Sequence, residues 1–296
     1  MSVTTPGIVQ TPVFDLPGHG WSRLVVKDES QQLSGAFKFR GNHHKLQQLP
    51  LGTHVVAAST GNHAAGLATA NAGRLPVTVY VPSTTPRAKL DRISAAGAEA
   101  VLVEGGYDDC ELEARAASAR TGAVFVHSFD DTDLIDGHRT LFREVERQSG
   151  LPDVAFVPVG GGGLITAALR EWGSRVRIVG VEYDQAPAMQ RSLAAGERIT
   201  LDSAVGMPEG LLVRRVGEIA FRTCLAHHVE IVLVGDAELR HAMKVLWSDS
   251  AIRAEGAGAA ALAAALMAPD ADAHALGIVS GGNINRSLWD EWVQPS

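Results

Sequence analysis

Short apolar runs alternate with segments of helical periodicity along most of the chain. The runs are rich in β-branched residues and stop at small or polar residues, as strands do. They lie at 24–26, 54–58, 77–81, 100–103, 124–126, 154–159, 177–181, 231–234 and 275–279. Helical segments lie between them, and two of these end at Gly73 and Gly97. The repeated alternation predicts an α/β fold with parallel sheets.

The strand-like runs are apolar at nearly every position, which is expected when helices cover both faces of a sheet. Residues 45–128 contain four compact strand–helix units and predict a small domain. Residues 1–44 and 129–296 then predict a large domain around a second sheet. We therefore expect two open, twisted, mostly parallel sheets flanked by helices. Because ligands lie beyond the carboxyl ends of strands in such sheets, a site is expected in the cleft between the domains.

The composition suits a large core, with 46% apolar residues and 31 glycines among 296 residues. The net charge of −7 gives no broad basic face and argues against a nucleic-acid partner. The longest apolar stretch, 257–268, is shorter than the ~18–20 residues of a membrane span and predicts a tightly packed helix. The first residues lack a signal-peptide pattern, so we expect a cytoplasmic protein with no membrane partner, in which Cys110 and Cys224 are reduced.

Four successive glycines, Gly160, Gly161, Gly162 and Gly163, follow one apolar run and precede a helical segment that begins at Leu164. Glycines let backbone N–H groups approach a phosphate closely, and a helix start adds the positive end of its dipole. A sharp turn without a ligand is the alternative, but four glycines exceed what such a turn requires. Neither a P-loop nor a dinucleotide fingerprint fits the spacing. The loop therefore predicts a phosphate site.

Lys38 lies between Phe37 and Phe39 near the start of the chain. An amine held against apolar neighbours has a lowered pKa, which favours the neutral nucleophile that an imine needs. In isolation, a solvated lysine would be the better interpretation. Combined with the phosphate loop and with the polar segment 59–63, the lysine predicts a covalently held aldehyde cofactor, pyridoxal 5′-phosphate.

A third polar segment, Ser59-Thr60-Gly61-Asn62-His63, stands where a strand passes into a helix. Its hydroxyls, amide and backbone N–H groups suit an anionic carboxylate. Plain capping of the helix by Ser59 or Thr60 is the alternative, and both roles are compatible. His63 alone would more often be structural.

Two charged segments are predicted to have structural roles and no part in catalysis or binding. Lys27-Asp28-Glu29-Ser30 is expected to be a charged turn. A second set is expected to be one solvated helix face with short-range ion pairs, and comprises Arg143, Glu144, Glu146 and Arg147.

In their motifs and in the order of those motifs, these segments resemble the serine/threonine dehydratase family of fold type II, tryptophan synthase β-like, pyridoxal-phosphate enzymes. The resemblance covers nearly the whole chain. Residues 34–41 resemble the family's Ser-Gly-Ser-Phe-Lys-x-Arg-Gly motif, with Ala36 replacing the second serine. The resemblance implies that Lys38 is the Schiff-base lysine, with Phe37 beside the cofactor. It also implies that Gly160–Gly163 and Leu164 form the phosphate cradle.

The same resemblance assigns the remaining site residues. Residues 59–63 resemble Ser-Ser-Gly-Asn-His, which implies that Asn62 contacts the cofactor's phenolic oxygen. Ser280-Gly281-Gly282-Asn283 resembles the segment whose serine hydrogen-bonds the pyridine nitrogen, and residues 255–258 resemble Glu-Pro-Ala-Gly. The implied cofactor contacts therefore include Glu255 and Ser280. The implied substrate contacts are Ser59, Thr60, Asn62, His63 and Phe129.

Three departures from the family pattern matter. Thr60 stands where racemase-like members carry a serine that acts as acid or base, and where simple serine dehydratases carry alanine. Glu182 matches the first carboxylate of the family's divalent-cation site, but the second position is Ala188, which cannot ligate, so no metal is predicted. The printed sequence ends soon after the Ser280 segment, so we expect no C-terminal regulatory domain of the kind found in biosynthetic threonine deaminases.

The resemblance predicts a lyase of amino acid metabolism with Lys38, Thr60 and Ser280 as catalytic residues. It would convert a small β-hydroxy amino acid such as threonine or serine, or a β-substituted analogue, to a 2-keto acid and ammonia by β-elimination. β-Replacement and racemisation on the same cofactor stay open, and a non-catalytic nucleotide-binding protein is a more distant alternative. A homodimer is implied by the resemblance only.

Overall fold

The computed structural model describes residues 3–5, 7–59 and 61–293. A six-stranded sheet has the strand order β11-β10-β9-β12-β4-β3, and β3 alone in it runs antiparallel to its neighbour in the described chain. Its strands are β3 (Val13–Asp15), β4 (Arg23–Asp28), β9 (Val154–Pro158), β10 (Arg177–Tyr183), β11 (Glu230–Val234) and β12 (His274–Val279).

A four-stranded sheet has the order β7-β6-β5-β8, and its paired strands are all parallel. Its strands are β5 (Val55–Ala58), β6 (Val77–Pro82), β7 (Glu99–Val103) and β8 (Val124–Phe125). Two short antiparallel strands precede both sheets, β1 (Val3–Thr5) and β2 (Ile8–Val9). The prediction of an α/β fold with two mostly parallel sheets is confirmed.

Helices flank both sheets. They are α1 (Lys38–Gln47), α2 (Asn62–Asn71), α3 (Arg87–Ala95), α4 (Tyr107–Thr121), α5 (Thr132–Ser149), α6 (Gly163–Trp172), α7 (Ala188–Ala195), α8 (Glu218–Ala226), α9 (Asp236–Ser250), α10 (Gly256–Met267) and α11 (Arg286–Val293). Three short 3-10 helices are η1 (Glu29–Gln31), η2 (Gly173–Arg175) and η3 (Glu209–Leu211). No helix in the described part of the chain has the length and apolar character needed to cross a bilayer.

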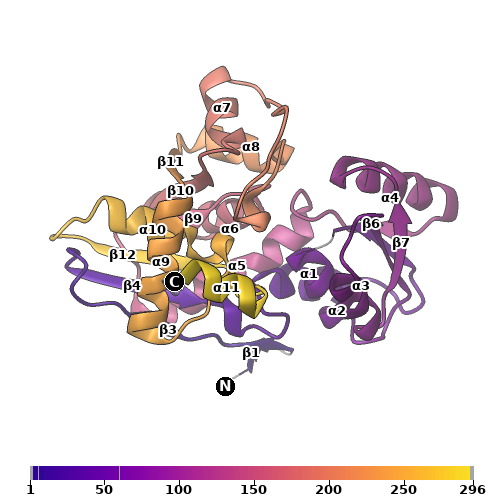
Figure 1. Ribbon diagram of the computed structural model, residues 1–296, viewed down its shortest axis with the longest axis horizontal. Coiled ribbons are helices and arrows are strands. Elements are labelled where there is room, and N and C mark those ends of the chain that lie inside the picture. The colour runs from indigo at the N-terminus through magenta and orange to yellow at the C-terminus, as the bar shows by residue number, and fades with distance from the viewer. Residues whose placement is uncertain (1–2, 6, 60, 294–296) are drawn as a thin grey trace.

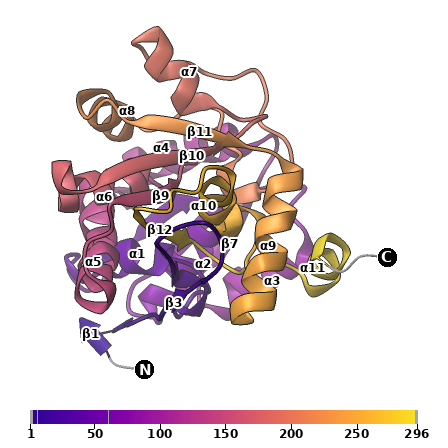
Figure 2. The ribbon, with the colours of Figure 1, turned by 90° about the vertical axis from the view of Figure 1, so that its left-hand side faces the viewer.

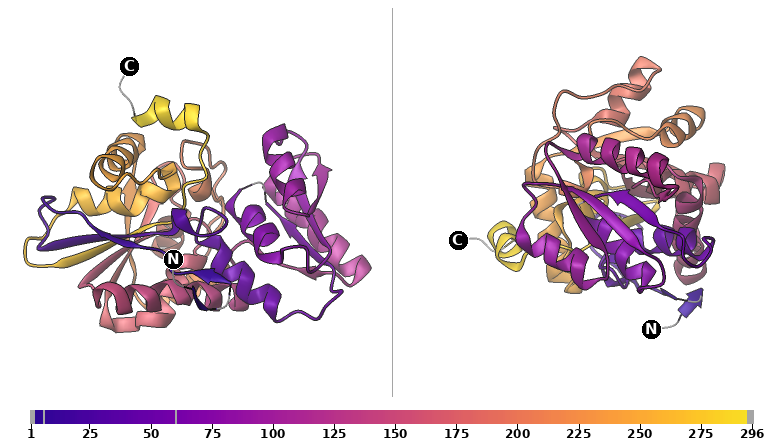
Figure 3. Two further views of the ribbon diagram at one scale, coloured as in Figure 1. Left: turned by 90° about the horizontal axis from the view of Figure 1, so that it is seen from below. Right: turned by 90° about the vertical axis from the view of Figure 1, so that its right-hand side faces the viewer.

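We call the six-stranded sheet with α5 to α11 the large unit, and the four-stranded sheet with α2 to α4 the small unit. The two units lie side by side (Figures 1 and 3). In the large unit, α5 and α6 lie on one side of the sheet and α9 and α10 on the other (Figure 2). Helix α1 packs against both α2 and α5 and so contacts both units. The domain boundaries at residues 44 and 128 therefore stay a prediction.

The alanine-rich stretch forms the buried helix α10, as predicted. Its residues from Gly256 to Ala265 are all buried. It packs against α9 and against strands β9 to β12. Small side chains allow a helix to lie this close to a sheet and to a second helix at once. Cys110 and Cys224 are free and buried, which agrees with the expectation of structural thiols.

The interpretation of residues 27–30 as a charged turn is wrong, and the interpretation of a solvated face on α5 is wrong at Glu144. Lys27 and Asp28 belong to β4, and the Lys27 side chain is fully buried. Glu144 lies on the buried side of α5, where it accepts from Lys27 Nζ at 2.9 Å and pairs with Arg40 at 2.8 Å. Arg40 also bonds Glu29 at 2.7 Å. Buried charges of this kind persist only when they are paired, and the pairing fixes α1 against β4 and α5.

Candidate active site

The lysine loop and the Ser280 segment lie against each other. Ala36 and Gly281 form an isolated antiparallel bridge, and Phe37 N–H donates to the Ser280 carbonyl at 3.0 Å. The Ser280 hydroxyl donates to the carbonyl of Ala257, in the first turn of α10, at 3.3 Å. Backbone hydrogen bonds thus connect two motifs that are far apart in the sequence, and Lys38 directly follows the residues that form these bonds.

The Lys38 side chain is half-buried at the start of α1. Its Nζ donates to the Ser128 carbonyl at 2.6 Å and lies 5.1 Å from the centre of the Phe37 ring. Burial lowers the pKa of Lys38 to about 8. An amine in this environment is a better nucleophile and base near neutral pH than a solvated lysine.

Asn62 connects three of the predicted segments. Its Nδ2 donates to Glu255 Oε1 at 2.5 Å, and its Oδ1 accepts from Asn283 Nδ2 at 2.8 Å. Asn283 also donates to the Ser34 carbonyl, at 2.8 Å, in the lysine loop. Burial raises the pKa of Glu255 to about 7, while the hydrogen bond from Asn62 opposes that shift. Asn62, Glu255 and the Ser280 segment are therefore gathered beside Lys38.

The segment before α2 contains both engaged and available groups. The Ser59 hydroxyl accepts from Gly61 N–H at 3.2 Å and Ala64 N–H at 3.3 Å, so it caps the helix. The His63 ring is buried, with Nε2 3.2 Å from the Val126 carbonyl and Nδ1 3.4 Å from Asn42 Nδ2. Burial and the neighbouring Lys38 lower the pKa of His63 to about 3, so the ring is neutral. While these contacts persist, both ring nitrogens of His63 are engaged, so His63 can bind a carboxylate only through its backbone N–H. Thr60 lies outside the described residues.

Packing accounts for much of the glycine content of the predicted phosphate loop. A Cβ on Gly161 would overlap the Phe129 ring, and a Cβ on Gly160 would lie 2.6 Å from the Gly210 carbonyl oxygen. Gly162 has a φ of +91°, which disfavours other residues. The number of glycines is thus weaker support for a phosphate than the sequence argument assumed.

The start of α6 supports the phosphate site more directly. The helix begins at Gly163 with Gly162 as its N-cap, and no side chain of the described chain caps it. Its first backbone N–H groups therefore suit an anion, such as the phosphate of a cofactor. Leu164 itself is buried within the helix.

Phe129, predicted to bind substrate, lies over this loop and directly follows Ser128, whose carbonyl accepts from Lys38 Nζ. Ser128 contacts Lys38 and its neighbour Phe129 contacts Gly161, so these two residues lie between the lysine and the glycine loop.

Glu182 does not fit the cation site that the resemblance implies. The side chain is buried, and its two oxygens accept from Met189 N–H at 2.7 Å and Gln190 N–H at 2.8 Å, at the start of α7. Burial raises the pKa of this carboxyl to about 7, although the two backbone hydrogen bonds oppose the shift. Ala188 offers no ligand, and the described residues contain no group of three or more potential metal-binding side chains. Helix N–H groups thus occupy the positions in which a cation would be bound.

Sequence reasoning missed Ser128, Asn283 and Tyr107. Ser128 follows the last strand of the small sheet, and its position after a strand was the available signal. Asn283 lay within the quoted Ser280 segment but had no role assigned. The contact between the Tyr107 hydroxyl and Ser128 Oγ at 3.1 Å joins residues of α4 and of a loop, and no local pattern indicates it.

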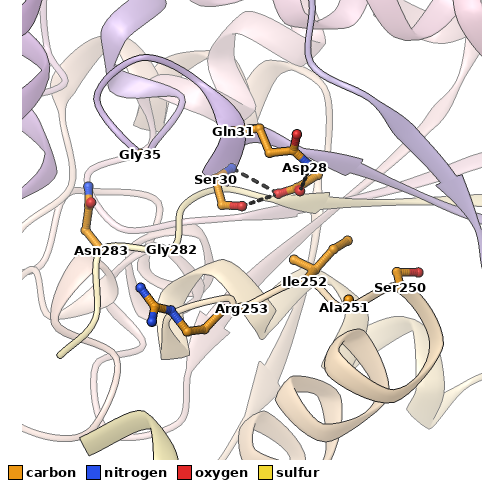
Figure 4. Close-up of a pocket in the computed structure, with 10 residues that line it drawn as sticks. All are labelled: Asp28, Ser30, Gln31, Gly35, Ser250, Ala251, Ile252, Arg253, Gly282 and Asn283. Atoms are coloured by element: carbon orange, nitrogen blue, oxygen red, sulfur yellow. Dashed lines mark hydrogen bonds between the residues drawn. The ribbon is translucent and has the colours of Figure 1, made fainter. Parts of the chain in front are cut away.

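A polar pocket of about 350 Å³ lies behind the junction of the lysine loop and the Ser280 segment (Figure 4). Gly35, Gly282 and Asn283 line one part of it, and Arg253 lies near them. Asp28 lies across from them, where it accepts from the Ser30 hydroxyl at 2.5 Å. The predicted catalytic and cofactor-binding residues do not line this pocket.

These features together fit a cofactor that carries an aldehyde and a phosphate: a half-buried amine of lowered pKa, an uncapped glycine-rich helix start, and a polar cluster between them. The chain belongs to the family of pyridoxal-phosphate dependent enzymes, which matches residues 4–281. It is therefore dependent on pyridoxal phosphate, and the recognition of fold type II from the sequence is confirmed.

Two bacterial relatives show what this chain is similar to. The L-threonine ammonia-lyase of Thermotoga maritima is 34% identical over 91% of this chain and 69% of the relative. That of Geobacter sulfurreducens is 38% identical over 88% of this chain and 67% of the relative. The chain therefore spans about two thirds of the length of these relatives. It spans 46% of the chloroplastic biosynthetic threonine dehydratase of Arabidopsis thaliana.

The chain is also similar in structure to solved proteins named as a threonine deaminase and a serine racemase. The processed form of threonine deaminase isoform 2 from Solanum lycopersicum has a TM-score of 0.91 and 29% identity, over 98% of this chain and 89% of that chain. Maize serine racemase has a TM-score of 0.88 and 28% identity, over 97% of this chain and 92% of that chain.

Proposed function

We propose that this protein is a pyridoxal-phosphate dependent ammonia-lyase that removes the β substituent of threonine, serine or a close analogue. The products are a 2-keto acid and ammonia. The position of Lys38 carries the proposal, because its amine has a lowered pKa and lies among the Asn62, Glu255 and Ser280 segments. The names of the bacterial relatives, both L-threonine ammonia-lyases, support elimination as the reaction.

The proposed roles follow from the chemistry of each group. When bound, pyridoxal phosphate withdraws electrons from the substrate Cα. Lys38 would hold the cofactor covalently in the absence of substrate, and its Nζ, when free, would take the Cα proton. The Cβ–O bond breaks, the departing hydroxide takes up a proton to form water, and hydrolysis of the product releases ammonia. Nζ is suited to proton removal because burial lowers the pKa of Lys38 to about 8, so more of the amine is neutral near neutral pH than in a solvated lysine.

The remaining residues would bind and orient. The uncapped start of α6 is proposed to hold the phosphate, and the start of α2 the substrate carboxylate. The Ser280 hydroxyl, which donates to the Ala257 carbonyl at 3.3 Å, is proposed to turn its proton to the pyridine nitrogen when the cofactor is bound. Because a hydroxyl is neutral, it would not keep a proton on that nitrogen as a carboxylate would. The electron sink is then weaker, which favours prompt loss of the β substituent.

Racemisation is the second candidate, because maize serine racemase resembles this chain closely in fold. A product panel separates the candidates. Purified protein should be incubated with L-threonine, L-serine, O-phosphoserine and β-chloroalanine. 2-Keto acid, D-amino acid and β-substituted product are then quantified, the last with a thiol added. Keto acid formed at the fastest rate supports the proposal. Faster formation of D-amino acid or of the substituted product would overturn it.

The cofactor linkage has a separate test. The protein as purified should absorb visible light, and borohydride should remove that absorbance and leave the cofactor attached to the peptide that contains Lys38. Attachment to any other lysine would refute the role of Lys38 without refuting the family.

A homodimer and a cytoplasmic location are further parts of the proposal. The free, buried cysteines are consistent with a reducing compartment. Light scattering coupled to size-exclusion chromatography would measure a mass of twice the 31.2 kDa chain for a dimer. A mass equal to one chain would refute the dimer.

A further inference from the structure

Ser128 lies on the segment that leads from β8 to α5, and its side chain is buried. Its carbonyl accepts from Lys38 Nζ at 2.6 Å. Its hydroxyl donates to the Ala58 carbonyl at 3.0 Å, at the end of β5, and accepts from the Tyr107 hydroxyl at 3.1 Å. One residue therefore contacts the lysine amine with its backbone and both β5 and α4 with its side chain.

The direction of this hydrogen-bond chain is fixed by its acceptor. A carbonyl oxygen only accepts, so the single hydroxyl proton of Ser128 points to Ala58. The Tyr107 phenol must then donate to Ser128 Oγ. Burial raises the pKa of Tyr107 above its ordinary value, so the phenol keeps the proton that it donates. Both ends of the Ser128 hydroxyl are thus engaged.

Helix α4 holds the preceding residue as well. His127 Nδ1 accepts from Phe129 N–H at 3.2 Å and from Asp130 N–H at 3.0 Å. Because Nδ1 accepts, the ring proton is on Nε2, which lies 3.4 Å from Glu111 Oε1. Burial opposes ionisation of Glu111, but hydrogen bonds from His127 and Arg115 lower its pKa to about 2. Tyr107 and Glu111 lie one turn apart on α4, so the helix fixes two successive residues of the segment.

We propose that Ser128, fixed by Tyr107, is a positioning residue for Lys38. This inference rests on the proposed function, in which the Lys38 amine alternates between a covalent bond to the cofactor and a free base. The Ser128 carbonyl is the acceptor to which the free amine returns. A lysine side chain has four rotatable bonds, and one fixed acceptor restricts where its lone pair points. A displacement of about 1 Å in such a group can lower a rate by about 100-fold.

The variants Ser128→Ala and Tyr107→Phe test the inference, because each removes one hydroxyl and leaves the Ser128 carbonyl in the chain. Ser128→Thr keeps the hydroxyl and should retain most activity. Tyr80→Phe is the matched control: Tyr80 lies on β6 of the small unit, and no hydrogen bond of its hydroxyl is found among the described residues.

Three measurements are compared for each variant. In Ser128→Ala and Tyr107→Phe we expect kcat to fall about tenfold or more, since Lys38 is less well placed. KM should change less than kcat. The isotope effect with Cα-deuterated substrate should rise, because proton removal limits the rate more strongly. In the absence of substrate, cofactor-free protein should also form the covalent cofactor absorbance more slowly, while its equilibrium affinity for pyridoxal phosphate is kept. Tyr80→Phe should match the wild type in all of these.

If Ser128 and Tyr107 only stabilise the fold, the three measurements should give a different result. Cofactor affinity and the midpoint of unfolding would then fall together with activity, and the isotope effect would stay unchanged. That outcome, or unchanged kcat and unchanged capture rate in both variants, overturns the inference. If wild-type protein itself fails to capture pyridoxal phosphate, the proposed function fails instead, so the two failures are distinguishable.

Discussion

The large unit and the small unit support their parts of the candidate site by different means. In the large unit, the glycine loop, Glu255 and Ser280 rest on a continuous apolar core that includes the fully buried helix α10. In the small unit, Asn62 and Ser128 rest on a smaller core and on side-chain hydrogen bonds, from Asn62 to Glu255 of the large unit and from Ser128 to the Ala58 carbonyl. We infer that the side that would hold the cofactor is fixed by packing, whereas the side that would hold the substrate depends on polar contacts.

The connection between the units shows the same difference. Among the described residues, two ion pairs link the large unit to helices α3 and α4: Lys89 to Glu209 and Arg214 to Asp108, each at 2.7 Å. Glu209 is 75% exposed and Asp108 is 63% exposed, so water and salt weaken both pairs. Only α1, which begins at Lys38, packs against helices of both units within the described chain to a comparable degree. The units are thus held together by helix α1, the helix that begins at the lysine.

The largest effect is expected from removing this shared residue. Lys38→Ala should lower turnover by ~10³-fold or more, because it removes both the covalent link and the base. Activity is measured without added amines, and cofactor content is measured in the same samples. Turnover close to that of the wild type would remove Lys38 from the mechanism.

The next largest effect concerns the packing of the large unit. A Cβ at Gly258 would lie directly against the Gly281 carbonyl oxygen, so Gly258→Ala should push α10 away from the Ser280 segment. We expect a loss of about 1–3 kcal/mol in the free energy of unfolding, together with weaker cofactor retention. Gly106→Ala in the small unit is the control, because nothing lies within 4 Å of its Cβ position. Equal effects of the two changes on urea denaturation would contradict the proposed difference between the units.

The pH dependence of kcat tests the role of Lys38 as the base. Lys38 acts as a base only when neutral, and its pKa is lowered to about 8. Below that pH the neutral fraction falls about tenfold per unit, so kcat should rise with pH and level off above about 8. The profile is measured at saturating substrate, with stability checked at each pH. A rate that falls as pH rises toward 8 would be inconsistent with a lysine base.

The smallest effect is expected from the ion pairs that link the units. Lys89→Ala and Arg214→Ala should each lower the free energy of unfolding by ~0.2–1 kcal/mol, and less at high salt. Arg87→Ala is a control, because Arg87 pairs with Asp91 within α3 alone, at 2.8 Å. Substrate KM should rise only in the first two variants. A rise in Arg87→Ala as well would show that the effect is not specific to contacts between the units.

The sequence predicted the sheets and the segments that meet at the candidate site, because parallel strands place the residues that follow them at one edge. It did not predict which charges are buried. Glu144 follows the spacing of a solvated helix face, and its partners Lys27 and Arg40 are 117 and 104 residues away along the chain. No local pattern contains such a pairing. The glycine loop was likewise overinterpreted, because the Phe129 ring that requires Gly161 approaches from a separate loop.

The pairing of β4 with β12 has a consequence for how the protein is made. Leu24 lies opposite Ala275, and Asp28 opposite Val279, so the strand that leads to the lysine is completed by one from near the end of the sequence. During synthesis on the ribosome, the Lys38 loop therefore cannot dock until β12 has emerged. Capture of the cofactor is expected to follow that step, and folding to be slowed by the closure of the long loop between the two strands.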